Sequence, residues 1–214
     1  DVQSLLVLAM HYGEGNVVTP TTGKGRVARY AWGSTDYHDL IHQRIKQLKQ
    51  YHQELLPNEQ CRGVVDTAPI LERDFAQMAG LGWIGKNTML IHSQQGSYFF
   101  LTILLSTAEL DFDQPSKTNH CGTCTACLDQ CPTNAFPAPH VLDATKCISY
   151  LTIEHRGTIS DELKQKMGDW VFGCDICQDV CPWNRRGPHP SEPGFVASEQ
   201  LNCLDIEQLF QSTE

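Results

Sequence analysis

The sequence has 214 residues, enough for one large domain or two modest ones. Its 16 Lys and Arg residues against 25 Asp and Glu residues give a formal net charge of −9, whereas nucleic-acid-binding surfaces are usually basic. Such an acidic chain can act on nucleic acid only through a local basic patch or a basic face elsewhere. No apolar run is long enough to span a bilayer, so we expect no membrane association.

The ten cysteines fall mostly in short-spaced motifs, and nothing resembles a signal peptide. We therefore expect a reducing, cytoplasmic location rather than a disulfide framework. The sequence opens on Asp1 and closes on a helix-like pattern, Leu204–Glu214, without a stop signal. We expect a monomer that is a fragment of a longer chain, with residues 191–214 as the start of a C-terminal helical region.

Residues 1–110 alternate apolar and amphipathic segments, which predicts an α/β domain. Ser4–Met10 is a continuous apolar run, typical of a strand buried on both faces. Tyr37–Leu56 is predicted to be an amphipathic helix with an apolar stripe of Ile41, Ile45, Leu48 and Leu55. A strand at Cys61–Pro69, a helix at Ile70–Gly80 and a strand at Ser97–Thr107 follow. The polar segment 109–119 predicts a domain boundary.

Residues 111–190 hold most of the cysteines and are expected to form a second domain. Within it, Ser160–Gly173 is predicted to be helical. Ser160 is the expected N-cap residue, and Asp161 and Glu162 suit the positive end of the helix dipole. The expected apolar stripe of this helix comprises Leu163, Met167, Trp170 and Val171.

Two cysteine motifs carry the chemistry of this second region. The first has the spacing C-x2-C-x2-C-x3-C-P and comprises Cys121, Cys124, Cys127 and Cys131. This spacing is typical of a cubane iron–sulfur cluster. The second motif has three cysteines before a proline: Cys174, Cys177 and Cys181. It lacks an upstream cysteine, which Cys147 can replace, so that eight thiolates are available for two clusters.

In two-cluster proteins the fourth cysteine of a run binds the other cluster. The first cluster is therefore expected on Cys121, Cys124, Cys127 and Cys181, and the second on Cys131, Cys147, Cys174 and Cys177. Zinc is the alternative metal, because C-x2-C pairs also bind zinc. The triple run with its following proline favours clusters. The remaining two cysteines, Cys61 and Cys203, are expected to be small buried hydrophobic residues.

Three further segments are unusual for a plain ferredoxin: Ala28–Ile41, Val64–Ala76 and the glycine-rich loop Gly80–Ile91. Together with the cluster motifs, they resemble the epoxyqueuosine reductase family from about Ser4 to the end. That family contains cobalamin-dependent iron–sulfur enzymes that complete the queuosine modification of tRNA. The resemblance implies a nitroreductase-like cobalamin-binding domain followed by a ferredoxin-like domain with two [4Fe-4S] clusters. It also implies an N-terminal segment and C-terminal helical repeats in full-length members.

The resemblance makes Asp66 the expected proton donor. Reduced cobalt is a strong nucleophile that can open an epoxide, and the departing oxygen then needs a proton. A carboxylic acid with a pKa raised by burial could supply it. An external donor of the flavodoxin or ferredoxin type would deliver two electrons through the clusters. The alternative for Asp66 is a cap on the following helix.

The resemblance also suggests other contacts. The residues expected to bind cobalamin, besides Asp66, are Tyr30, Gly85, Lys86, Asn87, Thr88, Cys174, Asp175, Ile176 and Cys177. His155 and Arg156 could touch the substrate tRNA, which carries epoxyqueuosine at the anticodon wobble position. For the glycine-rich loop the alternative is a structural turn, and for His155 and Arg156 a solvated turn.

Other functions are compatible with parts of the sequence. A corrinoid reductive dehalogenase would share the cobalamin domain and both clusters, but there we would expect a tyrosine proton donor rather than Asp66. A ferredoxin-type electron carrier would bind no corrinoid. A cobalamin-trafficking protein would not need two clusters.

Overall fold

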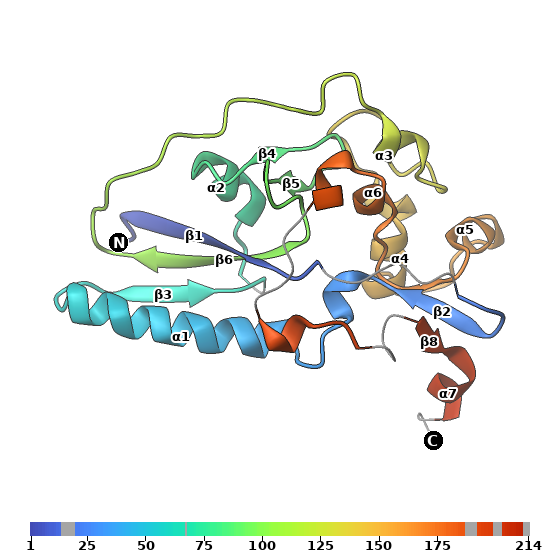
Figure 1. Ribbon diagram of the computed structural model, residues 1–214, viewed down its shortest axis with the longest axis horizontal. Coiled ribbons are helices and arrows are strands. Elements are labelled where there is room, and N and C mark those ends of the chain that lie inside the picture. The colour runs from blue at the N-terminus through green and yellow to red at the C-terminus, as the bar shows by residue number, and fades with distance from the viewer. Residues whose placement is uncertain (14–19, 67, 187–191, 199–202, 212–214) are drawn as a thin grey trace.

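The computed structural model describes residues 1–13, 20–66, 68–186, 192–198 and 203–211 (Figure 1). A three-stranded antiparallel sheet orders β1 (Ser4–His11), β6 (Phe99–Ser106) and β3 (Cys61–Val64), with β6 in the centre. Ile103 and Leu104 of β6 are fully buried, whereas β1 is only half-buried. The prediction that this first strand is buried on both faces is therefore wrong, because it lies at an edge of the sheet.

Helix α1 (Tyr37–Leu55) packs along β3 beneath this sheet in the view of Figure 1. The Asp36 side chain caps it by accepting the backbone N–H of His38. Ile41 and Ile45 face the core as predicted, but Leu55 is 60% exposed and does not belong to the buried stripe. It is the last residue of α1, where the helix has already passed the end of the core.

The other side of the sheet carries α2 (Glu72–Met78) and a small hairpin of β4 (Trp83–Ile84) and β5 (Leu90–Ile91). Their shared core is built on Ala76, Leu90 and Phe99. The segment that the sequence predicts as a plain glycine-rich loop is thus a paired hairpin, in which β4 and β5 hydrogen-bond to each other.

After β6, residues 107–119 cross the top of the molecule in Figure 1 and reach α3 (Ala126–Asp129). A second sheet then joins distant parts of the chain: β2 (Lys24–Val27) pairs in parallel with β7 (Trp170–Phe172) and antiparallel with β8 (Cys203–Asp205). The division into domains at the polar segment remains a prediction.

Helix α5 (Asp161–Met167) is shorter than the sequence predicts. Ser160 is its N-cap residue, as expected, and accepts the backbone N–H of Leu163. The helix ends at Gly168, whose φ of +62° is easily adopted only by glycine. Trp170 and Val171, predicted to lie on the helix stripe, instead belong to β7, because this segment pairs with β2.

The remaining elements are short: η1 (Arg29–Ala31), η2 (Ala144–Lys146), α4 (Ile148–Ile153), α6 (Ile176–Asp179), η3 (Pro182–Arg186), η4 (Pro193–Phe195) and α7 (Ile206–Gln211). The end of the predicted C-terminal helix, 212–214, lies outside the described residues. Among the described residues, no helix has the length and apolar character needed to cross a membrane.

Candidate functional site

The first cysteine set surrounds a cavity of about 280 Å³. The short helices α3 and α6 pack side by side, and this packing brings the cysteines of this set together from both motifs. Burial raises the pKa of the Cys127 thiol, and the neighbouring Cys181 and Cys121 raise it further. Iron binding would release the thiol protons of these cysteines, since thiolates are the ligands. The four cysteines that line the cavity are those predicted for the first cluster: Cys121, Cys124, Cys127 and Cys181.

The second set gathers at the start of α6. Burial raises the pKa of Cys174 to about 12, with further contributions from Cys147 and Cys131. Burial also raises the pKa of Cys177, which interacts with Cys174, Cys147 and, from the first set, Cys127. The chain thus brings the two predicted ligand sets together as separate but adjacent groups. In the described part of the chain, no three His, Cys, Asp or Glu side chains converge on a single metal-ion position.

Asp66 lies just after β3 in a left-handed backbone conformation, with φ of +52°. Its carboxylate accepts a hydrogen bond from the Tyr37 hydroxyl at 3.2 Å and lies 3.5 Å from Nε2 of His38. Nδ1 of His38 in turn lies 2.9 Å from the carboxylate of Asp36. The imidazole therefore connects two carboxylates, which suits a group that passes protons.

The burial expected for the Asp66 carboxylate is not provided by the protein itself, because this side chain is 68% exposed. Together with Phe100 and Arg73, it lines a cavity of about 190 Å³. Asp66 is not a helix cap either: α2 begins at Glu72, and its N-cap residue is Leu71. An exposed carboxylate beside a cavity is instead available to a ligand.

Aromatic rings form one wall of this region. Tyr37 stacks on Phe100 with ring centroids 4.2 Å apart, and Tyr30 meets Tyr37 edge-on at 6.2 Å. Tyr30 also contacts Phe172 of β7 at 5.9 Å. Burial raises the pKa of Tyr30 to about 12, so its hydroxyl stays protonated at neutral pH. Burial likewise raises the pKa of Tyr37, and nearby Asp66 adds to the shift, which keeps Tyr37 a hydrogen-bond donor.

The cavity beside Asp66 is smaller than the roughly 300–1,000 Å³ typical of small-molecule pockets. A cofactor as large as cobalamin could therefore occupy it only in part. Groups able to contact such a cofactor lie next to it: the exposed Asp66 carboxylate, which accepts the Tyr37 hydroxyl, and the ring of Tyr30. These residues fit part of the group.

The hairpin turn predicted to cradle the corrin has its polar side chains turned elsewhere. The Lys86 ammonium donates to the carbonyls of Gly122 and Cys124, and the Asn87 amide donates to the carbonyl of Cys177. Thr88 has a positive φ of +64°, and its carbonyl accepts from Arg73 at 2.6 Å. Contact of these side chains with a corrin remains a prediction.

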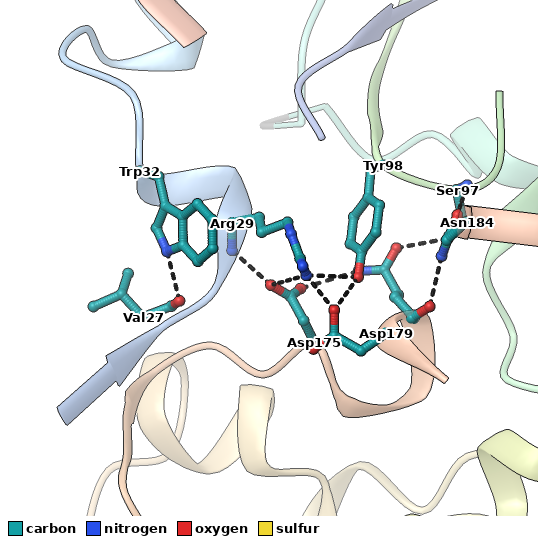
Figure 2. Close-up of polar contacts among 9 residues, drawn as sticks. Val27, Arg29, Trp32, Ser97, Tyr98, Asp175, Asp179 and Asn184 are labelled. Carbon is teal, nitrogen blue, oxygen red and sulfur yellow. Dashed lines mark hydrogen bonds and ion pairs between the residues drawn. The ribbon is translucent and has the colours of Figure 1, made fainter. Parts of the chain in front are cut away.

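A buried ionic network that the sequence does not reveal holds the second cysteine motif (Figure 2). The Arg29 backbone N–H donates to the Asp175 carboxylate at 2.6 Å, and its guanidinium pairs with Asp179. The Tyr98 hydroxyl donates to Asp179 at 2.7 Å. Complete burial raises the pKa of Asp175 to about 6, and the Arg29 N–H opposes this rise. Asp175, predicted to touch the corrin, thus has its side chain committed to Arg29 and Gln178.

His155 and Arg156 follow α4, on the side of the molecule that carries β7. Arg156 is exposed, and its guanidinium donates to the carbonyl of Ile153 at 3.2 Å. His155 is half-buried beside Tyr150. Their contact with RNA remains a prediction.

Two families match parts of the chain. Residues 120–184 match the family described as "4Fe-4S double cluster binding domain", in agreement with the two cysteine sets. Residues 1–67 match "Epoxyqueuosine reductase QueG, DUF1730". The first match and the cysteine arrangement define a double-cluster iron–sulfur protein.

Similar proteins of known name show which family of iron–sulfur proteins this chain belongs to. The epoxyqueuosine reductase of Cellulophaga algicola is 44% identical over 204 residues, covering 95% of this chain and 65% of the relative. That of Cyclobacterium marinum is 41% identical over 211 residues, covering 99% of this chain and 68% of the relative. The chain belongs to the epoxyqueuosine reductase family, which confirms the resemblance of its motifs. It spans about two thirds of the length of these two relatives.

Solved structures support the same family. An epoxyqueuosine reductase with an epoxyqueuosine-modified tRNA stem loop has a TM-score of 0.85 at 31% identity, covering 96% of this chain and 54% of that chain. The Bacillus subtilis enzyme, with its catalytic aspartate loop swung out of the active site, has a TM-score of 0.84 at 30% identity and the same coverage, 96% and 54%. A B12-dependent reductive dehalogenase shares the fold alone, with a TM-score of 0.55 at 18% identity over 85% of this chain and 26% of that chain.

Proposed function

We propose that this chain reduces epoxyqueuosine in tRNA to queuosine, using cobalamin and two [4Fe-4S] clusters. The observation that carries the proposal is the exposed Asp66 carboxylate, which lines a cavity, accepts the Tyr37 hydroxyl and lies next to His38. Two comparisons support epoxyqueuosine-containing tRNA as the substrate: the chain belongs to the epoxyqueuosine reductase family, and a relative's structure contains an epoxyqueuosine-modified tRNA stem loop. The location is the cytoplasm, and the donor is an external flavodoxin or ferredoxin.

The proposed reaction converts an epoxide into an alkene. It consumes two electrons and two protons, breaks both carbon–oxygen bonds and releases the oxygen as water. Cobalamin, when bound, supplies a nucleophilic reduced cobalt centre for opening the ring. Asp66 gives a proton to the alkoxide as the first carbon–oxygen bond breaks. His38, 3.5 Å away, can return a proton to Asp66, and the Tyr37 hydroxyl holds the carboxylate in place.

Two one-electron clusters suit this two-electron reaction. The ligand sets are adjacent, because Cys177 of the second set interacts with Cys127 of the first. We assign residues 1–110 to the catalytic domain, 111–190 to the cluster domain and 191–214 to the start of a helical region. The chain works as a monomer, with Tyr30 and the loop Cys174–Cys177 facing the cofactor and with His155 and Arg156 facing the RNA.

The test is an anaerobic titration of the reconstituted chain with cob(II)alamin, followed by reduced donor and an anticodon stem loop that carries epoxyqueuosine. We expect the cobalt EPR spectrum to change from that of the free cofactor to a base-off form, and the modified nucleoside to lose one oxygen by mass spectrometry. An EPR spectrum identical to that of free cofactor, together with unconverted RNA, would show that this chain is an electron carrier instead.

The cluster assignment gives a second expected result. Replacing Cys147 by serine removes one ligand from the second cluster only, so iron should fall from about eight to about four atoms per chain. Iron and acid-labile sulfide analysis measures this change. Cys61→Ser is the matched control, since Cys61 lies in β3 away from both ligand sets, and it should retain all the iron. Equal losses in both variants would contradict the assignment.

A further inference from the structure

One hairpin turn of the first half of the chain, Gly85–Met89, contacts segments from both cysteine motifs. Its shape is fixed by two backbone hydrogen bonds, from Gly85 to Met89 at 2.8 Å and from Thr88 to Gly85 at 2.9 Å. There is no space for a side chain at Gly85, because a Cβ there would lie 2.5 Å from Ile91 and 2.7 Å from the Asn87 amide. These contacts define the shape of the turn that carries Lys86 and Asn87.

Lys86 holds the loop of the first cysteine motif. Its ammonium donates two hydrogen bonds of 2.8 Å, to the carbonyls of Gly122 and Cys124. Gly122 has a φ of +50°, so this loop makes a sharp turn around the ammonium group. Lys86 also lines the cavity of the first cysteine set, and it is the only Lys, Arg, Asp or Glu among the described residues that do so.

Asn87 holds the loop of the second motif. It is 3% exposed, its amide nitrogen donates to the Cys177 carbonyl at 3.2 Å, and its amide oxygen accepts the Met89 N–H at 3.3 Å. The segment between the two motifs is attached as well, because His140 donates its backbone N–H to the carbonyl of Lys86 at 3.0 Å. Adjacent residues of one turn thus hold three parts of the cluster region.

We infer that Lys86 and Asn87 are positioning residues of the electron path. Lys86 positions the loop of the first cluster and places a positive charge beside it, and Asn87 attaches the loop of the second cluster to the same turn. The inference rests on the proposed function, because it requires both clusters. It gives Lys86 and Asn87 a different role from the corrin contacts that the sequence suggests. The structure supports this role with three hydrogen bonds to the cysteine loops.

The charge of Lys86 has a definite consequence. Reduction adds one negative charge to a cluster, and a nearby ammonium group stabilises that charge. Cluster reduction potentials respond to net charge and to hydrogen bonding around the sulfur atoms. Lys86 should therefore make the first cluster easier to reduce, which helps it to accept an electron from an external donor.

The experiment is a redox titration, followed by EPR, of the reconstituted chain and its Lys86→Met variant. At a fixed ambient potential we expect the ratio of reduced to oxidised first cluster to fall about tenfold, equal to about 59 mV for a one-electron couple. Repeating the titration in a Cys147→Ser background isolates the first cluster. Lys86→Arg keeps the charge and should restore the ratio to within about twofold.

Lys164→Met is the matched control, because it removes the same charge from an exposed position on α5, where Lys164 pairs with Asp161. It should leave the ratio unchanged. For Asn87→Leu we expect altered magnetic coupling between the two reduced clusters while the iron content stays the same, because the second loop is no longer tied to the turn.

The outcomes separate the inference from the function on which it rests. Full iron content with an unchanged potential in Lys86→Met would overturn the inference and leave the proposed function intact. Loss of cobalamin binding with an unchanged potential would also overturn it, and would return Lys86 to a corrin contact. A wild-type chain that takes up neither iron nor sulfide would overturn the proposed function, and the inference with it.

Discussion

Replacing Asp66 by asparagine is expected to lower the turnover of an epoxyqueuosine-containing stem loop by about 10²–10⁴-fold, the usual contribution of a positioned general acid. Asparagine keeps the size of the side chain and can still accept the Tyr37 hydroxyl, but it has no proton to give. Binding of cobalamin should persist. Single-turnover kinetics with a pre-reduced chain measures the chemical step without the external donor.

Two further variants test whether a loss of turnover is specific to the Asp66 carboxylate. Asp113→Asn removes a carboxylate from the exposed polar segment and should leave turnover unchanged. His38→Gln removes the imidazole beside Asp66 and should slow repeated turnovers more than the first one, if His38 returns the proton. Near-normal single turnover in Asp66→Asn would show that the proton comes from another group and would remove the main support for the proposed mechanism.

The position of Asp66 shows what the sequence can and cannot predict about the site. The segment that carries this carboxylate is recognisable by its resemblance to a family and not by any periodicity. Its left-handed backbone, its exposure and its contacts with Tyr37 and His38 depend on α1 lying next to the end of β3. No local pattern carries that information. The cysteine ligands are different, because their spacing alone indicates clusters.

The same contrast holds for the fold. Strands β1 and β6 are predictable because each is a long, nearly continuous apolar run, and helix α1 is predictable because its apolar residues repeat with helical spacing. The β2–β7–β8 sheet is not, since its strands have three or four residues each and come from distant parts of the chain. Trp170 and Val171 fit a helical stripe in the sequence, but Gly168 ends α5 and β2 offers hydrogen bonds to the segment that follows. Long-range pairing overrides the local pattern there.

The Arg29 network has no sequence signal either, because its members come from η1, from Tyr98 just before β6 and from the second cysteine motif. Its structural role follows from burial: the Arg29 side chain is 11% exposed and Asp175 is 2% exposed as a residue. The guanidinium also lies 4.7 Å from the centre of the Tyr98 ring, which adds a cation–π contact. Arg29 therefore neutralises carboxylates on the loop that carries Cys174, Cys177 and Cys181.

Replacing Arg29 by methionine is expected to lower the free energy of unfolding by about 3–5 kcal/mol, because it leaves Asp175 and Asp179 without their cation in a buried site. Methionine keeps an unbranched apolar side chain in place of the arginine stem, and the backbone N–H still reaches Asp175. Urea unfolding of the cluster-loaded chain, followed anaerobically by circular dichroism, measures the change. Lys164→Met is the control: it breaks the exposed pair with Asp161 and should cost less than about 1 kcal/mol.

A rescue variant separates lost charge balance from lost packing. If uncompensated carboxylates cause the instability, then Asp175→Asn and Asp179→Asn added to Arg29→Met should recover most of the loss, because neutral amides need no cation. Asparagine at 175 can still accept the Arg29-position backbone N–H, and asparagine at 179 can still accept the Tyr98 hydroxyl. No recovery in the combined variant would mean that Arg29 stabilises this region through its packing against Tyr98 and Trp32. In that case the carboxylates beside the second cluster tolerate burial without the Arg29 guanidinium.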